Sequence, residues 1–266
     1  MKKSNRIIMV VAALSLLLMT IAACADDSGD SLTINPGILT MATSADFPPY
    51  EFWEGGQIVG IDAEIAAAIA NKLGLELQIE DMDFNSVLVS VETGMFDIAM
   101  AGLTVTPDRL EQVNFSISYA NGVQAILVRE DSPITSVDDL FADGAFHSIG
   151  VQLSTTGDLY STWDLEDEGL AVIERFTSGA DAIMALVNGR VDAVIIDNAP
   201  AKAFVQMNPE LIILPTEFAN EDYAIAINLE NTALLEAING ALTELIADGT
   251  VQGIIDKYIS RLILRD

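Results

Sequence analysis

The 266 residues can form one large core or two modest ones, and with 51% apolar side chains the chain is typical of a folded globular protein. Forty acidic residues against 12 basic ones give a formal net charge of −28, which disfavours binding to nucleic acids and anionic lipids and would steer cations. The simplest role of this acidity is solubility in a salty or acidic exterior.

The N-terminus has the pattern of an export signal. Lys2, Lys3 and Arg6 precede an apolar run over residues 7–21 that is short for a membrane span. The order Ile-Ala-Ala-Cys that follows resembles a bacterial lipoprotein lipobox, in which Cys24 becomes the lipidated first residue. Cys24 is the only cysteine, so no internal disulfide can form. Lipidation would explain why an exported protein has a single thiol at this position. The alternative is an ordinary signal peptide with an incidental cysteine.

Cleavage before Cys24 makes residues 1–23 the predicted signal peptide. Residues 24–36 are small, polar and acidic, which is typical of a solvated tether between an anchor and a fold. We therefore expect an exported protein held by its lipid on the outer face of the bacterial cytoplasmic membrane.

Strand and helix patterns alternate in the first half of the chain. The expected strands are residues 38–45, 75–82 and 96–102. The expected helices are residues 61–74, which stop at Gly74, and a helix capped by Asn85 or Ser86 that ends at Gly94.

The second half repeats this scheme. The expected strands are residues 148–152, 170–176 and 190–197, and the expected helices are residues 179–189 with Ser178 as cap, 231–249 and 251–262, the last two broken at Gly249. Such alternation predicts an α/β fold with mainly parallel sheets.

Two of these strands, residues 96–102 and 190–197, have a similar sequence context, and we call them the echoing strands. Each follows a helix that ends at glycine, and Asp97 and Asp192 stand at the same offset, as two lobes built on one plan would produce. In open α/β sheets, ligands lie beyond the carboxyl ends of the strands. There the first echoing strand leads to Arg109, whereas the second ends at Asp197. One lobe therefore offers a cation and the other an anion.

Arg109 occupies the first turn of a predicted helix. Thr106 can cap that helix and Pro107 suits its first position, but a positive charge there is unfavourable unless an anion shares the site. Arg109 could thus bind a carboxylate and Asp197 an ammonium group. A molecule that carries both groups is a free α-amino acid.

A plainer alternative assigns both charges to local structure. Arg109 would pair with Asp108 or Glu111 on the surface, and Asp197 would cap the helix that starts near Pro200. Spacing alone does not separate the two interpretations.

Longer motifs resemble a known family. The segments ATSADFPPYEF, IVGIDAEIAAAIA, MDFNSVL, FDIAMAGLTVTPDR, IGVQLSTTG, RVDAVIIDNAP, DYAIAI and ALTELIADGTVQGIIDKYI are similar to the extracytoplasmic solute-binding proteins of polar amino-acid ABC importers. The likeness extends over residues 38–259. It implies the type II periplasmic-binding-protein fold, with two α/β lobes, a hinge of two crossings and a ligand cleft between the lobes.

The resemblance also implies the lobe boundaries and the site. The crossings would lie near residues 119–123 and 219–223, so lobe 1 would comprise residues 37–120 plus 223–266, and lobe 2 residues 121–222. Arg109 would clamp the ligand carboxylate and Asp197 its ammonium, while Phe47 and Phe84 match aromatic positions that sandwich the ligand side chain. The remaining implied ligand-binding residues are Ser44, Gly102, Thr104, Gln152, Thr155 and Thr156, with Ser154 in the same loop.

Ligand preference is less well defined. Some relatives that prefer basic or amide ligands carry an acid at the position of Ser44, and some amide binders carry lysine at that of Gln152, so this sequence departs at both. No second cation is placed for an acidic ligand, which leaves neutral polar and cationic side chains. Glu51, Asp62 and Glu221 could favour a cation if they line the cleft; otherwise they are surface acids.

A binding protein is favoured over an enzyme. His147 is the only histidine and is expected to be exposed, so no Ser/His/Asp or Cys/His nucleophile set can be built. The sequence also has no Walker phosphate loop, no paired-histidine zinc motif and no calcium loop. We expect no cofactor and no metal, a monomer, and transporter permease subunits as partners that read lobe closure. The alternative is a dehydratase-like enzyme of the same fold that uses Glu51 or Glu221 as general acid on a small carboxylic acid.

Overall fold

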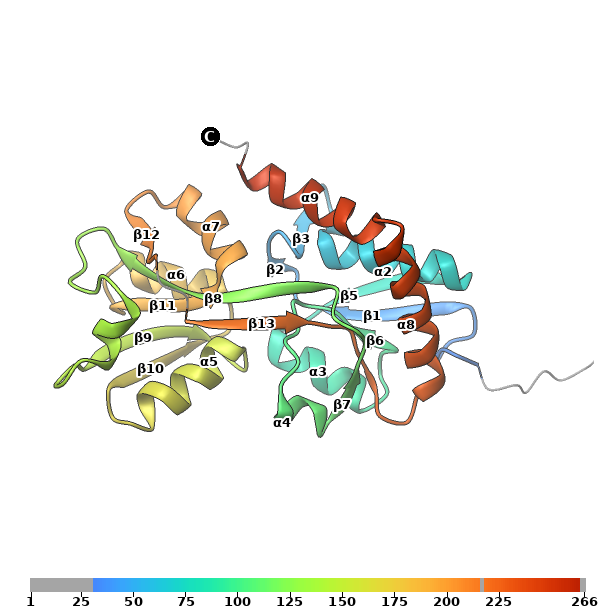
Figure 1. Ribbon diagram of the computed structural model, residues 1–266, viewed down its shortest axis with the longest axis horizontal. Helices are drawn as coiled ribbons and strands as arrows, with labels where there is room; N and C mark the ends of the chain where they lie inside the picture. Colours follow the sequence, from blue (N-terminus) through green and yellow to red (C-terminus); the bar gives the residue numbers. More distant parts are fainter. Residues whose placement is uncertain (1–30, 216–217, 264–266) are drawn as a thin grey trace, which may run out of the picture. The chain divides into compact units, whose positions relative to one another are not determined.

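The first of two large sheets is shown at the right of Figure 1, in a computed structural model that describes residues 31–215 and 218–263. Its strand order is β5-β1-β6-β14-β7, formed by β1 (Ile38–Thr43), β5 (Glu76–Asp81), β6 (Ile98–Ala99), β7 (Val113–Phe115) and β14 (Ala226–Asn228). β1 pairs in parallel with β5 and β6, whereas β14 runs antiparallel to β6 and β7. The predicted signal peptide and Cys24 lie outside the described residues.

Helices cover this sheet on both sides: α2 (Ile61–Leu73), α3 (Phe84–Glu92), α4 (Pro107–Leu110), α8 (Thr232–Ala247) and α9 (Thr250–Ile263). α2 ends at Gly74, whose φ of 69° is the left-handed conformation that glycine adopts without strain. The prediction of this stop is confirmed. Gly249, with a φ of 83°, separates α8 from α9 as expected.

The predicted start of α3 was wrong. Asp83 is the N-cap, and its carbonyl oxygen accepts the Ser86 N–H at 2.8 Å, so the first turn closes before Asn85 or Ser86 can act as a cap. The Asp83 side chain makes no capping hydrogen bond either. The helix therefore begins at Phe84, which brings that ring to its N-terminal end.

A small antiparallel sheet was not predicted. It consists of β2 (Asp46–Phe47), β3 (Glu51–Glu54) and β4 (Gln57–Val59), in the order β2-β3-β4. Phe47 pairs with Glu51, and Phe52 pairs with both Asp46 and Val59. The pairing of β2 with β3 fixes the position of Phe47.

The second large sheet has the order β10-β9-β11-β8-β12, with β13 also paired to β8. Its strands are β8 (Ala120–Arg129), β9 (His147–Gln152), β10 (Ala171–Phe176), β11 (Ala193–Asp197), β12 (Leu211–Ile213) and β13 (Ala219–Tyr223). β9 is parallel to β10 and β11, and β8 is antiparallel to its neighbours. The helices of this lobe are α5 (Thr156–Ser161), α6 (Gly179–Val187) and α7 (Asn198–Met207), with a 3₁₀ turn (Val137–Phe141) and a π-helical turn (Thr162–Glu166).

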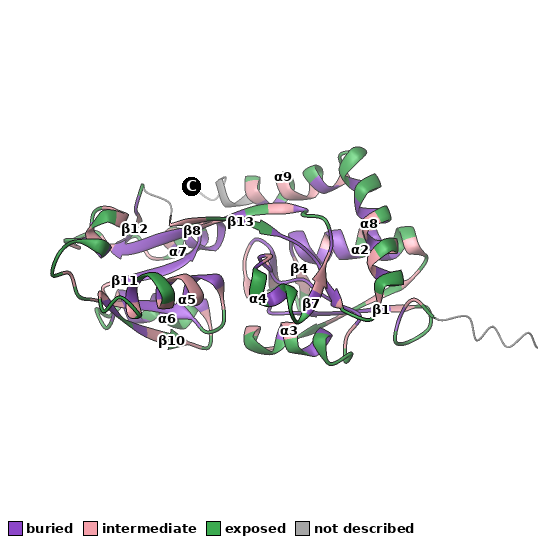
Figure 2. Ribbon diagram, turned by 60° about the horizontal axis from the view of Figure 1, so that its bottom comes forward, coloured by how far each residue is buried: buried purple, intermediate pink, exposed green. Residues whose placement is uncertain are grey.

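Two strands connect the lobes. β8 and β13 run antiparallel from the pair Ala219 and Gln124 to the pair Tyr223 and Ala120, and Figure 1 shows them crossing together from one sheet to the other. Separate apolar clusters occupy each side, built around Leu39 and Met41 in one lobe and Leu127 and Ile149 in the other. Figure 2 shows this burial concentrated in the strands of both sheets. The predicted α/β fold with two lobes is confirmed.

The echoing aspartates have equivalent positions. Asp97 accepts hydrogen bonds from the backbone N–H of Thr40 at 2.8 Å and from its hydroxyl at 2.6 Å. Asp192 accepts the backbone N–H of Ser148 at 2.8 Å. Thr40 and Ser148 belong to the parallel strands β1 and β9, one in each lobe, so each aspartate ties its loop to the corresponding strand of its own sheet.

Among residues 31–215 and 218–263, no helix combines the length and apolarity that a membrane span requires. The same part of the chain contains no cluster of histidine, cysteine or acidic side chains arranged to hold a metal ion.

Candidate ligand-binding site

Arg109 lies inside the protein and not on its surface. Thr106 caps the one-turn helix α4, accepting the Arg109 N–H at 3.3 Å, and Pro107 follows at the first helical position as predicted. The Arg109 side chain is 6% exposed; its guanidinium donates to the carbonyl oxygen of Thr104 at 2.8 Å and to that of Ser154 at 3.2 Å. The second bond joins the two lobes.

The surface-pair alternative for Arg109 is wrong. Within the described chain, the guanidinium makes no ion pair with either acidic neighbour, Asp108 or Glu111. Burial lowers the pKa of Arg109, while the charges of Glu221 and Asp197 oppose that shift. Because α4 has only four residues, its dipole is small, and the guanidinium itself provides the positive charge.

Asp197 ends β11 and stands at the N-cap position of α7, yet its side chain makes no capping hydrogen bond. The capping alternative is therefore wrong. Its carboxylate is turned toward β8 and β13, where it accepts from Gln124 Nε2 at 2.8 Å and contacts the Tyr223 hydroxyl. The pKa of Asp197 lies well above its usual value. Burial is the main cause and the charge of Glu221 is the second.

The loop between β9 and α5 brings the polar groups of the second lobe to the same place. Ser154 has a φ of 67°, a left-handed conformation that is uncommon for a residue with a side chain. Thr155 caps α5, accepting the Asp158 N–H at 3.2 Å, and its hydroxyl donates to the Gln152 carbonyl oxygen at 2.8 Å. The Thr156 hydroxyl accepts from Gln124 Nε2 at 3.2 Å.

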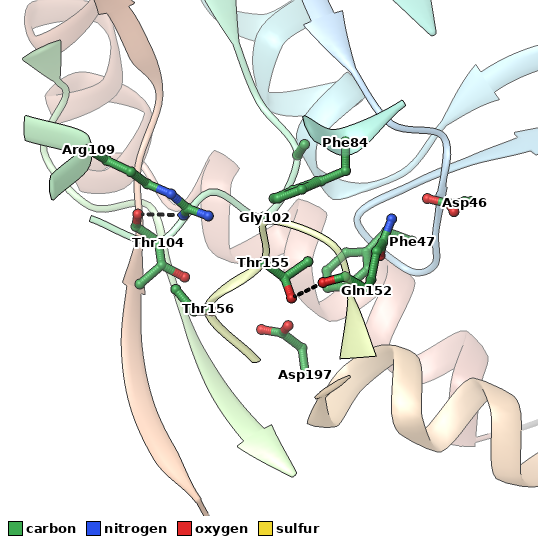
Figure 3. A pocket seen from close by; sticks show the side chains of 11 residues that line it. Asp46, Phe47, Phe84, Gly102, Thr104, Arg109, Gln152, Thr155, Thr156 and Asp197 are labelled. Carbon is green, nitrogen blue, oxygen red and sulfur yellow. Dashed lines mark hydrogen bonds between the residues drawn. The ribbon is translucent and has the colours of Figure 1, made fainter. Parts of the chain in front are cut away.

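A cavity lies between these groups (Figure 3). Nine of the ten predicted ligand-binding residues line it: Phe47, Phe84, Gly102, Thr104, Arg109, Gln152, Thr155, Thr156 and Asp197. Its free volume is about 10 Å³, which is about what one ordered water requires. The lining comes from both lobes, so the cavity belongs to the interface between them.

Ser44 is the predicted residue that does not line the cavity. Its side chain is buried, and its hydroxyl donates to Asp46 Oδ1 at 3.2 Å. Asp46 and Ala101 line the cavity and were not predicted. A sequence signal for Asp46 did exist, because it is an acidic residue next to the aromatic Phe47, three residues after the end of the buried strand β1.

Opposite charges lie at different places in the cavity. In Figure 3, Arg109 is at the left, Asp46 at the right and Asp197 between them, with the Phe84 ring above. The Arg109 guanidinium carbon is 5.9 Å from the centre of the Phe84 ring. Burial raises the pKa of Asp46, although its hydrogen bond from Ser44 acts in the other direction.

Glu51, Asp62 and Glu221 do not line the cavity, so none of them favours a cationic side chain by direct contact there. Glu51 and Asp62 are fully buried. Asp62 accepts the Gly102 N–H at 2.9 Å and the Tyr119 hydroxyl at 2.8 Å, which holds the backbone of a cavity residue in place. Burial raises the pKa of Asp62 to about 6.

His147 differs from expectation. It is the first residue of β9 and half-buried, where the sequence suggested an exposed residue before the strand. Its Nε2 lies 3.3 Å from the carbonyl oxygen of Asp139. It does not line the cavity.

Comparison with known proteins places this geometry in a family. Residues 39–261 match the bacterial extracellular solute-binding proteins, family 3. The chain is 30% identical over 253 residues to the arginine-binding extracellular protein ArtP of Bacillus subtilis (strain 168), covering 92% of this chain and 97% of that protein.

Solved structures give the same result. An ancestral arginine-binding protein bound to arginine has a TM-score of 0.77 and 37% identity, over 84% of this chain and 98% of that one. The ancestral amino acid-binding protein AncCDT-1, a precursor of cyclohexadienyl dehydratase, has a TM-score of 0.75 and 31% identity, over 84% and 96% of the two chains. The chain therefore belongs to family 3 of the bacterial extracellular solute-binding proteins.

Proposed function

We propose that this protein binds a free amino acid with a cationic side chain outside the cell and delivers it to the permease of an ABC importer. The observation that carries the proposal is that Arg109 of one lobe and Asp197 of the other line a single cavity. Both are more than nine-tenths buried, at 6% and 7% exposure. Two opposite charges held apart in a buried cavity suit a zwitterion.

The α-carboxylate would bind Arg109 and the α-ammonium would bind Asp197. A guanidinium can hold a carboxylate through two parallel charge-assisted hydrogen bonds, each contributing about 1.5–3 kcal/mol. Leaving either protein charge buried without a partner costs several kcal/mol, which favours a ligand that carries both groups. Thr104, Gly102, Thr155 and Thr156 would complete the contacts to the ligand head.

The side chain would extend between Phe84 and Phe47 toward Asp46. A guanidinium or ammonium group there would meet a carboxylate, with aromatic faces that attract cations along the way. Arg109 is the only basic residue among those that line the cavity, so no second cation is available for aspartate or glutamate. The arginine-binding relatives named above support the same class of ligand.

Lobe movement would control access. A free volume of about 10 Å³ admits a water but no amino acid, so the lobes must separate before a ligand can enter. Separation would break the hydrogen bond from Arg109 to the Ser154 carbonyl, and closing on the ligand would replace it. We place the hinge at β8 and β13, lobe 1 at residues 37–120 plus 223–266 and lobe 2 at residues 121–222. The permease would recognise the closed form.

Export and anchoring complete the proposal. Residues 1–23 would be removed as a signal peptide, Cys24 lipidated, and residues 24–36 would tether a monomer to the outer face of the cytoplasmic membrane. We propose no enzymatic activity and no cofactor. The dehydratase alternative has less support, because neither of its candidate general acids, Glu51 and Glu221, lines the cavity.

Calorimetric titration with a panel of free amino acids tests the proposal. L-Arginine or L-lysine should bind with one-to-one stoichiometry and more tightly than L-glutamine, whereas L-glutamate should not bind measurably. The proposal fails if no amino acid binds. Turnover of a small carboxylic acid such as prephenate, without amino-acid binding, would favour the enzyme.

Asp46→Asn tests where the cationic side chain is bound. We expect the affinity for L-arginine to fall by about tenfold, because a charge-assisted contact becomes a neutral one, while any binding of L-glutamine stays unchanged. Asp83→Asn is the matched control, since it removes a nearby exposed carboxylate that does not line the cavity. Equal losses for arginine and glutamine would place the cationic group elsewhere.

A further inference from the structure

Glu221 is a second buried carboxylate beside Asp197. It lies in the crossing strand β13 and is 5% exposed, and it does not itself line the cavity. Its Oε2 accepts from Gln124 Nε2 at 3.0 Å. The same nitrogen donates to Asp197 Oδ2 at 2.8 Å. One amide group therefore bridges carboxylates that belong to the second lobe and to the hinge.

The Gln124 amide has fewer hydrogens than there are oxygens around it. Gln124 Nε2 carries two hydrogens but lies within hydrogen-bond distance of three oxygens, those of Asp197, Glu221 and Thr156. Glu221 Oε1 is buried and has no hydrogen-bond partner among the described residues. An unsatisfied buried acceptor is costly, so the cluster favours any group that brings further hydrogens.

The surrounding charges point the same way. Arg109 on α4 faces the pair. Burial lowers the pKa of Arg109, and the charges of Glu221 and Asp197 raise it again, with Glu221 having the larger effect of the two. Tyr160 on α5, Tyr223 on β13 and Tyr50 also face it. Burial, the charge of Glu221 and a hydrogen bond with Glu221 raise the pKa of Tyr160, and burial with nearby acids raises that of Tyr50. Glu51 on β3 is a further buried acid, and burial, nearby Asp62 and, less strongly, the charge of Asp197 raise its pKa. One cation thus faces the two carboxyl groups of the pair.

We propose that Glu221 is the second carboxyl group of the ammonium site, and that the Asp197–Glu221 pair holds one proton before ligand binding and releases it when the ligand ammonium arrives. The inference rests on the proposed function. An ammonium group brings three N–H donors and a positive charge, so it replaces both the proton and the missing hydrogens. The released proton leaves the carboxyl oxygen for the solvent.

The sign of the pH dependence follows from linkage. Burial and repulsion raise the pKa of Asp197 in the free protein, and the ligand ammonium lowers it again in the complex. Affinity is therefore fully present above the raised pKa, and it falls by up to about tenfold for each pH unit as the pH drops below that value. Replacing Glu221 by glutamine removes the repulsion and should flatten this dependence.

Calorimetry of L-arginine binding in two buffers of equal pH but different ionisation enthalpy counts the protons exchanged. Wild-type protein should release up to about one proton per arginine near the raised pKa. Glu221→Gln should release markedly fewer, with a much weaker pH dependence of Kd. Glu168→Gln, which alters an exposed glutamate of the same lobe, should behave as wild type. Asp46→Asn identifies any proton that Asp46 contributes.

Each result decides the matter. Binding without proton release between pH 5 and 9, or equal release from Glu221→Gln and wild type, would overturn the role of Glu221 while leaving amino-acid binding intact. If wild-type protein binds no amino acid at all, the proposed function fails and this inference with it. Should Glu221→Gln not fold, the wild-type Kd still tests the proposal, because a pH-independent Kd contradicts it.

Discussion

Arg109→Ala is expected to lower the affinity for L-arginine by about 10²- to 10⁴-fold. The guanidinium would lose two charge-assisted hydrogen bonds to the ligand carboxylate, each contributing about 1.5–3 kcal/mol, and each 1.4 kcal/mol corresponds to a factor of ten. The loss should apply to every amino acid that binds, because all carry the same α-carboxylate. Calorimetric titration of the wild-type and variant proteins measures it.

Two variants serve as controls for Arg109. Arg109→Lys keeps the charge but loses the planar fork, so its affinity should lie between those of wild type and Arg109→Ala. Arg190→Ala removes an arginine that is 65% exposed and paired with Glu174 outside the cavity, and should leave binding unchanged. A loss confined to arginine, with other amino acids unaffected, would show that Arg109 contacts the side chain and not the carboxylate.

The elements with strong periodicity could be predicted from the sequence alone. α2 buries Ile61, Ile65 and Ile69 on one face, and β1 is buried along nearly its whole length, so each carries its signal within its own residues. The same is true of the echoing aspartates, whose common offset reflects the same contact with a neighbouring parallel strand.

The small sheet could not be predicted, because its support comes from distant residues. β2, β3 and β4 are two to four residues long, too short for an alternating pattern to be distinct. Phe52 in β3 packs edge-on against Tyr258 of α9, with ring centres 6.2 Å apart, across more than 200 residues of chain. No local pattern contains that contact.

Some residues of the candidate site could likewise be predicted from the sequence, whereas others depend on contacts between distant segments. Sequence reasoning identified Arg109 and Asp197 from their positions after echoing strands, and the structure brings both to one cavity. It pointed to Ser44, but Asp46 lines the cavity and Ser44 only donates a hydrogen bond to Asp46 Oδ1. The clustering of Glu221 with Asp197 depends on the pairing of β13 with β8, which joins segments about 100 residues apart.

Gly60→Ala is expected to destabilise the protein by about 3 kcal/mol or more, or to prevent folding. Gly60 has a φ of 135° and a ψ of −177°, a conformation that is essentially restricted to glycine. An added Cβ would lie 2.0 Å from the Tyr50 carbonyl oxygen and 2.9 Å from the Glu51 nitrogen, and backbone atoms cannot turn aside as a side chain can. Thermal or denaturant unfolding followed by circular dichroism measures the loss.

The effect should extend from stability to binding. The Tyr50 carbonyl accepts the Asp62 N–H at 3.0 Å and the Pro49 carbonyl accepts the Ile61 N–H at 3.1 Å, so the chain that leads from Phe47 is fastened to the start of α2 at this point. Any folded Gly60→Ala protein must shift that segment, and with it Phe47, so weaker binding of L-arginine should accompany the lower stability.

Gly240→Ala is the matched control. It lies within α8, where an added Cβ would meet no atom within 4 Å, so the substitution should stabilise the protein by up to about 1 kcal/mol. Opposite signs for the same chemical change would show that the close approach of Gly60 to Tyr50, and not the loss of a glycine as such, limits the fold. Equal stability of Gly60→Ala and wild type would contradict this account of how the Phe47 segment is held against α2.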